Sequence, residues 1–289
     1  MSTAGTNSVP ETVGVLGGGR MGAGIAHAFC VAGAAVVVVE QNDDAAEAAR
    51  GRITAALDRS IAKGSTQESL DALSARLQVS TDYKAFASCG LVVEAVPEDL
   101  ALKTAALRGV EEHLDAGAWL ATNTSSLSVG ELAGVLQRPD RFCGLHFFNP
   151  VPASTLIEVV LAPSTSAELA EKARGWAEAL GKTPVVVKDA PGFASSRLGV
   201  AIALEAMRMV EEGVASAEDI DTAMVLGYKH PVGPLRTTDI VGLDVRLGIA
   251  EYLESTLGER FAPPQVLRDK VARGELGRKS GQGFFAWDE

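Results

Sequence analysis

His146 and Glu158 are the two side chains whose types and spacing best suit proton transfer. His146 lies near the end of the apolar run 142–148, before a proline-bounded loop, and Glu158 lies twelve residues later in the apolar run 156–161. If the two runs form antiparallel strands around that loop, the imidazole and the carboxylate meet. A carboxylate that fixes the tautomer and orients the ring lets a histidine take the proton of a hydroxyl. The alternative is a pair of unrelated buried polar groups.

A glycine-rich turn near the start of the chain is suited to hold a dinucleotide. Gly17, Gly19 and Gly22 fill the pattern G-x-G-x-x-G between the apolar run 13–16 and a helix predicted over 21–32. The first glycine permits a tight turn, the second lets the backbone approach a pyrophosphate, and the third lets the helix pack close to the strand. The amides that begin the helix then face the phosphate. The alternative is a glycine-rich turn without a ligand.

Glu40 indicates which dinucleotide is held. It follows the apolar run 36–39, and no arginine accompanies it at Gln41 or Asn42. A carboxylate at this point accepts hydrogen bonds from the adenosine ribose and repels a 2′-phosphate, so we expect NAD rather than NADP. Beside a nicotinamide ring, a His146–Glu158 pair would take the proton of an alcohol while hydride leaves its carbon for the cofactor.

The alternation of apolar runs with helical periodicity predicts the scaffold for these residues. It continues to residue 188 and is typical of a Rossmann-type, doubly wound α/β sheet. We expect a helix over 43–63, capped by Asp43 or Asp44, whose arginines form a solvated face or contact an anionic tail such as coenzyme A. Glu94, within the strand-like run 91–96, needs a partner if it is buried.

A polar cluster, Asn123 to Ser126, follows the strand-like run 119–123. Ligands of Rossmann folds bind outside the carboxyl ends of the strands, and this cluster is predicted to lie there. Its side chains suit helix capping and substrate contact alike, and the two interpretations are compatible.

Strand-like runs end near Asp189, and helical patterns follow over 193–212, 216–226 and 242–257. We therefore predict two domains, an NAD-binding Rossmann domain over 1–188 and an all-helical C-terminal domain over 189–289 for substrate binding and dimerisation. A helical unit appended to a Rossmann domain often buries its apolar faces in a homodimer.

The composition is that of an ordinary globular protein, with 47% hydrophobic and 22% charged residues. A net charge of −11 argues against a nucleic-acid partner. Cys30, Cys89 and Cys143 lie far apart without metal-ligand spacing, so we expect free thiols in a reducing cytoplasm and no metal site. The apolar run 28–39 is shorter than the roughly 20 residues that span a bilayer, and no basic segment precedes it as in a signal peptide.

The chain resembles the L-3-hydroxyacyl-CoA dehydrogenase family, which includes bacterial 3-hydroxybutyryl-CoA dehydrogenases. Matching segments run through nearly the whole chain in the family's order: GGGRMGAGIA from Gly17, LVVEAVPED from Leu91, TNTSSLSV from Thr122, GLHFFNPVP from Gly144, PGF from Pro191, EDIDTAM from Glu218, HPVGPL from His230 and GRKSGQGFF from Gly277. The resemblance implies a reversible, NAD-dependent oxidation of an (S)-3-hydroxyacyl-CoA to the 3-oxoacyl-CoA.

The resemblance also implies roles for individual residues. His146 matches the family's catalytic base, Glu158 its orienting carboxylate and Ser125 the serine that contacts the reacting oxygen. Glu98 and Lys103 match positions near the nicotinamide. The full set matched to cofactor binding is Gly17, Gly19, Arg20, Met21, Gly22, Glu40, Glu98, Lys103 and Asn123. The implied partners are an acyl-CoA substrate and a second copy of the chain, bound through the helical domain.

Ser196 departs from the family pattern. After PGF the family carries an Asn before an Arg, and here Ser196 precedes Arg197. That Asn helps to place the substrate near the catalytic histidine, so Ser196 counts among the candidate catalytic residues and leaves the acyl group open. A serine is shorter, and a water or a differently shaped substrate would fill the gap. We expect Ser196→Asn to shift the preferred chain length.

Other functions remain open beside this one. They are a relative that acts on a carrier-protein thioester, a dicarboxylic acyl-CoA or a sugar acid, and a non-catalytic NAD-binding protein. HFFNPVP argues against the sugar acid, and the joint presence of His146, Glu158 and Ser125 argues against lost catalysis.

Overall fold

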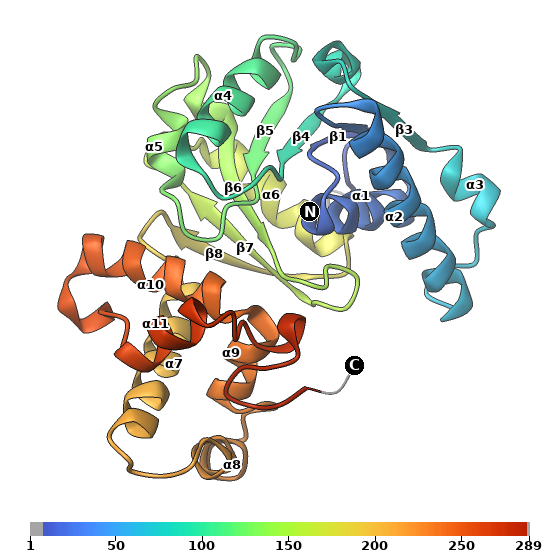
Figure 1. Cartoon of the computed structure of the whole chain (residues 1–289). Coiled ribbons are helices and arrows are strands. Elements are labelled where there is room, and N and C mark those ends of the chain that lie inside the picture. The colour runs from blue at the N-terminus through green and yellow to red at the C-terminus, as the bar shows by residue number, and fades with distance from the viewer. Residues whose placement is uncertain (1–7, 288–289) are drawn as a thin grey trace, which may run out of the picture. The chain divides into compact units, whose positions relative to one another are not determined.

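An eight-stranded sheet forms the centre of the first of two compact units in this computed structural model, which describes residues 8–287 (Figure 1). The strand order is β3-β2-β1-β4-β5-β6-β7-β8. The strands are β1 (Thr12–Leu16), β2 (Ala35–Val39), β3 (Leu77–Ser80), β4 (Leu91–Glu94), β5 (Trp119–Thr122), β6 (Phe142–Phe147), β7 (Leu156–Leu161) and β8 (Thr183–Lys188). All neighbours pair in parallel except β6 and β7. The predicted Rossmann-type sheet is confirmed.

Helices cover both faces of this sheet (Figure 1). They are α1 (Arg20–Val31), α2 (Asp43–Ala62), α3 (Leu70–Ser74), α4 (Leu100–Glu111), α5 (Val129–Ala133) and α6 (Ala167–Ala179), with short 3₁₀ helices at Tyr83–Ser88 and Pro139–Arg141. Buried side chains of α1, α2 and α6, among them Ile25, Ile53 and Trp176, form one apolar core with the strands. Burial of apolar surface stabilises a fold by roughly 25 cal/mol per Å². The core therefore holds in place the strands whose ends carry the polar residues of the candidate site.

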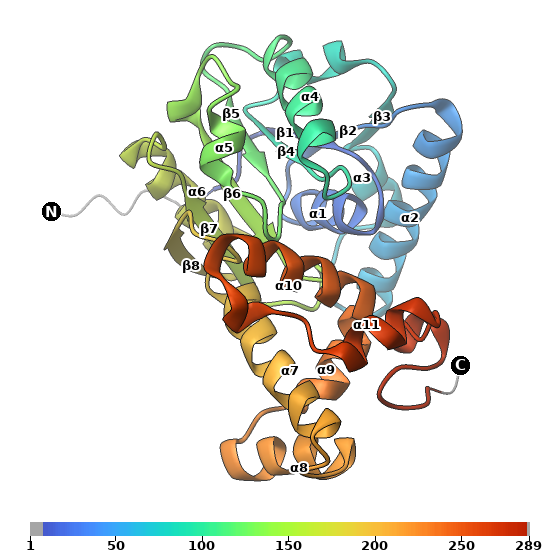
Figure 2. The same cartoon turned by 60° about the vertical axis from the view of Figure 1, so that its left-hand side comes forward.

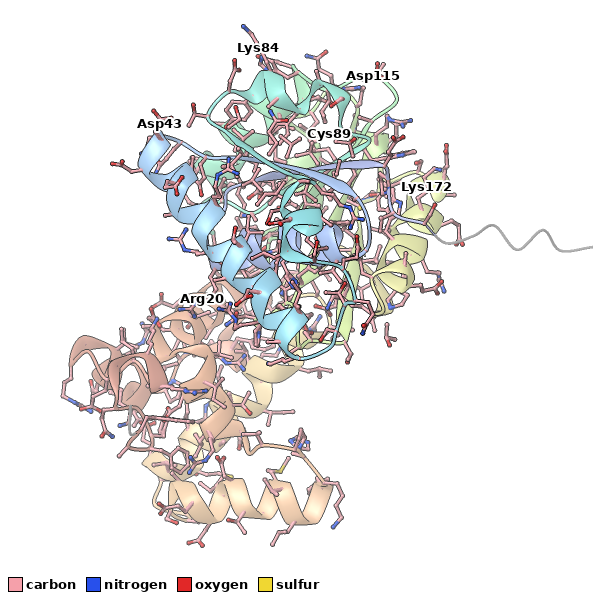
Figure 3. The ribbon with its side chains drawn as sticks, turned by 90° about the vertical axis from the view of Figure 1, so that its right-hand side faces the viewer. Arg20, Asp43, Lys84, Cys89, Asp115 and Lys172 are labelled. Atoms are coloured by element: carbon pink, nitrogen blue, oxygen red, sulfur yellow. The ribbon has the colours of Figure 1, made fainter. Side chains whose placement is uncertain are left out.

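The cap of α2 differs from the prediction. Asn42, and neither Asp43 nor Asp44, has the extended backbone of an N-cap, and its Oδ1 accepts a hydrogen bond of 2.9 Å from the amide of Ala45. Figure 3 labels Asp43 at the amino-terminal end of the helix, where its charge lies in the first turn. A carboxylate in the first turn interacts favourably with the positive end of the helix dipole. The two aspartates therefore stabilise α2 without capping it.

The boundary between the two units follows Asp189. The carboxylate of Asp189 accepts hydrogen bonds from Ser128 Oγ at 2.7 Å and from the amides of Val129 and Gly130 at 3.1 and 2.8 Å. These donors begin α5, so Asp189 holds the amino end of that helix and belongs to the first unit.

The second unit is built of helices, as predicted. They are α7 (Ser195–Glu211), α8 (Ala217–Tyr228), α9 (Pro234–Val241), α10 (Leu243–Leu257) and α11 (Gln265–Ala272), with 3₁₀ turns at Glu259–Phe261 and Arg278–Ser280. Figure 2 shows α7 and α10, which contact one another. Buried apolar side chains such as Val200, Met207 and Leu253 form a core of its own for this unit. No helix within residues 8–287 has both the length and the apolarity needed to cross a bilayer.

Candidate functional site

The antiparallel pairing of β6 and β7 brings His146 and Glu158 together. The two residues are direct partners in the strand register, and His146 Nδ1 lies 2.8 Å from Glu158 Oε2. His146 is 6% exposed and Glu158 is 1% exposed. The ring of Phe148 lies 4.4 Å from the imidazole, centroid to centroid. The predicted contact is therefore confirmed as geometry, in a place where little water competes for the hydrogen bond.

The glycine turn lies between β1 and α1, as the sequence predicts. Gly17 has φ +90°, which a residue with a side chain rarely adopts. A Cβ on Gly22 would lie 1.7 Å from the carbonyl oxygen of Gly17, so only glycine lets α1 start this close to β1. These two glycines are required by the fold itself.

Gly19 differs from its neighbours. A Cβ built on it meets no atom within 4 Å, and its φ of −62° suits any residue. It is the N-cap of α1, yet no side chain caps this helix and no acidic residue lies in the first turn, where Arg20 and Met21 stand. The amino end of α1 therefore carries neither a capping side chain nor an acidic residue, and a helix N-terminus after a strand is the arrangement that accepts a pyrophosphate. The residues present fit a dinucleotide.

Glu40 lies at the carboxyl end of β2 beside this turn. Its Oε1 accepts a hydrogen bond of 2.6 Å from the amide of Gly18, and its Oε2 accepts one of 3.2 Å from the amide of Gln41. The carboxylate is thus held at the edge of the glycine turn, within the region where an adenosine ribose bound to a Rossmann fold lies.

Glu98 organises the polar cluster that follows β5. Its Oε1 accepts hydrogen bonds from Thr124 Oγ1 at 2.7 Å, from the amides of Ser125 and Ser126 at 2.9 and 3.0 Å, and from their hydroxyls at 3.2 and 3.1 Å. Burial opposes the charge on Glu98, but the ammonium of Lys103 and these donors outweigh it and lower the pKa of Glu98 below its ordinary value. An ionised Glu98 therefore fixes the position of Ser125.

Lys103 is 1% exposed and directs its ammonium at protein groups. Its Nζ lies 2.7 Å from Glu94 Oε1, 3.1 Å from the carbonyl of Val96 and 3.5 Å from Glu98 Oε2. Glu94 also accepts a hydrogen bond of 2.6 Å from Thr122 Oγ1. The partner that Glu94 required is thus Lys103, and the two form a buried ion pair beneath the polar cluster.

Asn123 connects the two halves of the site. Its Oδ1 accepts a hydrogen bond of 2.9 Å from the amide of Phe147, the residue after His146. β5 and β6 are parallel neighbours, so this bond ties the end of β5 to the strand that carries the histidine. The polar cluster and the His146–Glu158 pair therefore lie at the same end of the sheet, where β5 and β6 stop.

Ser196 belongs to the second unit. It is the second residue of α7 and is 9% exposed. Sequence reasoning missed several buried charged residues, among them Lys182 and Arg246. Lys182 donates to the carbonyls of Val151 and Ser154 at 2.7 and 2.5 Å and so holds the loop between β6 and β7. Arg246 is buried in α10. Neither belongs to a motif with a fixed pattern, so only packing could find them.

The cysteines do not form a metal site. All three are buried free thiols, and burial raises the pKa of each to about 12. Figure 3 labels Cys89 among the side chains inside the unit. Residues 8–287 hold no cluster of three or more histidine, cysteine or acidic side chains suited to a metal ion. Thiols held neutral by burial are inert.

Comparison with known proteins gives matches over both units. The model of the NAD binding domain of 3-hydroxyacyl-CoA dehydrogenase matches residues 12–190, and that of the C-terminal domain of 3-hydroxyacyl-CoA dehydrogenase matches 192–287. A probable 3-hydroxybutyryl-CoA dehydrogenase of Deinococcus radiodurans is 40% identical over 275 residues, which cover 95% of this chain and 99% of the relative.

Two further proteins are similar over nearly their whole length. The mitochondrial hydroxyacyl-coenzyme A dehydrogenase of Homo sapiens is 39% identical over 96% of this chain and 92% of its own. The crystal structure of (S)-3-hydroxybutyryl-CoA dehydrogenase from Ralstonia eutropha superposes with a TM-score of 0.92 at 38% identity, covering 97% of this chain and 100% of that one.

Proposed function

Because this chain belongs to the 3-hydroxyacyl-CoA dehydrogenase family, we propose that it interconverts (S)-3-hydroxyacyl-CoA and 3-oxoacyl-CoA thioesters with NAD. The observation that carries the proposal is the buried hydrogen bond of 2.8 Å between His146 and Glu158, on the sheet edge that also holds the glycine turn. This is the arrangement that alcohol oxidation needs, a base for the hydroxyl proton near a hydride acceptor.

His146 is the general base of the proposed reaction. The contact of Nδ1 with Glu158 orients the ring and leaves Nε2 as the atom that takes the hydroxyl proton during oxidation and returns it during reduction. Ser125 contacts the reacting oxygen. Glu98 holds this serine in place by accepting hydrogen bonds from its amide and its hydroxyl, and Lys103 in turn holds Glu98. Ser196 contributes to substrate placement from α7. Bound NAD supplies the hydride acceptor.

The cofactor site uses the glycine turn and the ends of neighbouring strands. Gly17, Gly19 and Gly22, with Arg20 and Met21 at the start of α1, receive the pyrophosphate, and Glu40 accepts the ribose hydroxyls. Glu98, Lys103 and Asn123 complete the nicotinamide side. Lys103 acts there by positioning Glu98, since its ammonium already contacts Glu94, Val96 and Glu98.

We also propose a homodimer through the helical unit. Among the described residues, eleven large hydrophobic side chains are exposed and eight of them belong to this unit: Leu198, Ile202, Val214, Leu226, Tyr228, Ile240, Val241 and Val245. Such a concentration of exposed apolar side chains is typical of a protein interface. The three buried free thiols support a reducing compartment, which we take to be the cytoplasm.

The experiment that tests the function follows NADH consumption with acetoacetyl-CoA, with NADPH as a parallel cofactor. We expect turnover with NADH and little with NADPH. In the same assay His146→Ala should lower turnover by about 10²-fold or more while NADH still binds. Absence of turnover with either cofactor, in a protein shown to bind NADH, would contradict the proposal for this substrate.

A further inference from the structure

Lys182 is a buried lysine that the proposed mechanism does not use. It stands between α6 and β8 in the first unit and is 9% exposed. Its ammonium donates hydrogen bonds to the carbonyls of Val151 and Ser154, at 2.7 and 2.5 Å. Burial lowers the pKa of Lys182 below its ordinary value. Because a buried ammonium is costly unless its donors find acceptors, these two carbonyls account for the place of this charge in the fold.

The end of α6 fixes where the lysine stands. Gly181 has φ +70°, and its amide donates to the carbonyl of Glu178 at 2.9 Å. The amide of Lys182 donates to the carbonyl of Ala177, also at 2.9 Å. These two bonds form the Schellman motif, which ends a helix on a left-handed glycine. The next residue begins β8, which pairs with β7. The backbone is therefore held on both sides of Lys182, and its side chain reaches the loop from a fixed point.

The loop that Lys182 contacts, residues 148–155, lies directly beyond the His146–Glu158 pair. In the register of β6 and β7, Phe147 pairs with Ile157 and is the only paired residue between His146 and the loop. Strand ends open locally more easily than strand centres do. Phe148, the first residue of the loop, also packs its ring 4.4 Å from the imidazole, centroid to centroid. A displaced loop would therefore disturb both the pair and the contact that covers the histidine.

Val151 gives the same loop a second anchor. It is 2% exposed, and a Cβ built on Gly24 would lie 2.8 Å from the Cβ of Val151, so this side chain packs against the backbone of α1. The amide of Ser154 donates to the carbonyl of Pro150 at 3.0 Å, which closes a turn. Lys182 binds two carbonyls of this turn. The loop is thus clamped between α1 on one side and the ammonium on the other.

We propose that Lys182 is a positioning residue for the reaction: its ammonium clamps the loop 148–155 and so keeps the imidazole of His146 oriented on Glu158. This inference rests on the proposed function, because it takes His146 to be the general base. Lys182 acts through the loop and touches neither substrate nor cofactor. Its loss should therefore slow the chemical step and leave the binding of NADH unchanged.

The kinetic test uses Lys182→Met, which keeps the length of the side chain and removes its charge and its donors. We expect the single-turnover rate of NADH oxidation at saturating acetoacetyl-CoA to fall about tenfold or more, since a misplacement of about 1 Å can cost roughly 10²-fold in rate. The dissociation constant of NADH, measured by fluorescence titration, should stay within about twofold of the wild-type value, because the glycine turn is unchanged.

Hydrogen–deuterium exchange tests the clamp without any assay of activity. The amide of Phe147 donates to Asn123 Oδ1 at the mouth of the loop. In Lys182→Met, peptides that cover residues 147–157 should exchange faster than in wild type, while peptides from β1 and β4 should exchange at the wild-type rate. Such a pattern would report local opening at the loop rather than a loss of stability throughout the unit.

Two further variants separate positioning from folding. Arg141 directly precedes β6, and its guanidinium donates to the carbonyls of Gly117 and Ala118. Arg141→Met removes the same kind of cation–carbonyl contact at the opposite end of the strand and should keep the wild-type single-turnover rate, even if its melting temperature falls. Lys182→Gln is uncharged and one bond shorter than lysine but keeps N–H donors. It should show smaller changes in the same directions, which decides the matter if Lys182→Met does not fold.

The outcomes distinguish this inference from the function on which it rests. A wild-type single-turnover rate or wild-type exchange in Lys182→Met would overturn the clamp. An equal loss of rate in Arg141→Met, or exchange raised equally throughout the first unit, would assign Lys182 to general stability and also overturn it. Absence of turnover in the wild-type protein would instead contradict the proposed function, and the exchange experiment would still decide whether Lys182 holds the loop.

Discussion

His146 Nδ1 and Glu158 Oε2 lie 2.8 Å apart because their residues face one another in the antiparallel register of β6 and β7. Directly opposed residues of such a pair have Cβ atoms about 5 Å apart, within reach of a histidine and a glutamate. Both side chains are buried, and the loop between the strands is held by Lys182 through the carbonyls of Val151 and Ser154. The sheet therefore sets the geometry of the pair before any ligand binds.

The first prediction concerns this pair. We expect His146→Ala to lower kcat by about 10²- to 10⁴-fold, the usual contribution of a positioned general base. Glu158→Ala should lower kcat as well, and the double variant should lose no more than His146→Ala alone, because Glu158 acts only through the histidine. Steady-state kinetics of the three variants, with NADH titration by fluorescence, measures both effects.

A control variant and the double variant test whether the effect is specific to the His146–Glu158 pair. His113→Ala changes a histidine whose Nδ1 contacts the backbone of α4, and it should leave kcat unchanged. A double variant markedly slower than His146→Ala would mean that Glu158 contacts substrate or cofactor independently.

The second prediction separates two glycines of the same turn. Gly22→Ala places a Cβ 1.7 Å from the carbonyl of Gly17 and should destabilise the fold, seen as a lower melting temperature. Gly19→Ala meets no atom within 4 Å and should fold normally, but its methyl group enters the space that a pyrophosphate approaches. We expect NADH affinity to fall at least about tenfold, or about 1.4 kcal/mol, in this variant. Wild-type affinity in Gly19→Ala would place the pyrophosphate elsewhere.

The third prediction concerns cofactor choice. Glu40→Ala removes the carboxylate that repels a 2′-phosphate, so the ratio of kcat/KM for NADPH to that for NADH should rise about tenfold or more. The loss of its contact with the amide of Gly18 should reduce stability slightly, because one hydrogen bond contributes about 1 kcal/mol. Glu47→Ala, on the exposed face of α2, is the control for the loss of one negative charge. An unchanged ratio would mean that Glu40 does not select the cofactor.

Sequence periodicity predicted the regular elements well because strands of a parallel sheet are buried on both faces and form continuous apolar runs. The prediction that His146 meets Glu158 depended on one condition, that β7 runs antiparallel to β6, and the structure meets it. Short helices were missed. α9 begins at Pro234 and α11 follows Pro264, and each has eight residues, which are too few turns to display a helical period.

Charged side chains in the interior were harder to predict than elements. Glu94 needed a partner, but nothing in its strand indicated that Lys103, nine residues later, would supply the buried ammonium. Arg246 could not be identified at all, because a buried and an exposed arginine look the same in a helical pattern. Such pairings depend on which helix face packs where, and this is determined by tertiary structure rather than by local sequence.

The last prediction concerns acid stability and His27 in α1. This side chain is 4% exposed, its Nε2 lies 2.8 Å from Ser60 Oγ, and its Nδ1 has no partner within residues 8–287. Burial, helped by the charges of Arg59 and Lys182, lowers the pKa of His27 below its ordinary value of 6.5. At pH values between this lowered pKa and 6.5, His27 binds a proton in the unfolded chain but not in the folded protein. The free energy of unfolding should therefore fall as pH drops below about 6.5, with a slope of at most about 1.4 kcal/mol per pH unit from this residue.

Urea unfolding between about pH 7.5 and 5 measures that slope. His27→Gln cannot take up the proton and should flatten the pH dependence, even if it lowers stability at neutral pH through altered packing. His113→Gln, which changes a histidine just after the end of α4, should keep the wild-type slope. Because Glu98 also has a lowered pKa, further loss of stability is expected at still lower pH in every variant, as its carboxylate becomes protonated and releases Ser125 and Ser126. An undiminished slope in His27→Gln above about pH 5 would assign the acid sensitivity to groups other than this histidine.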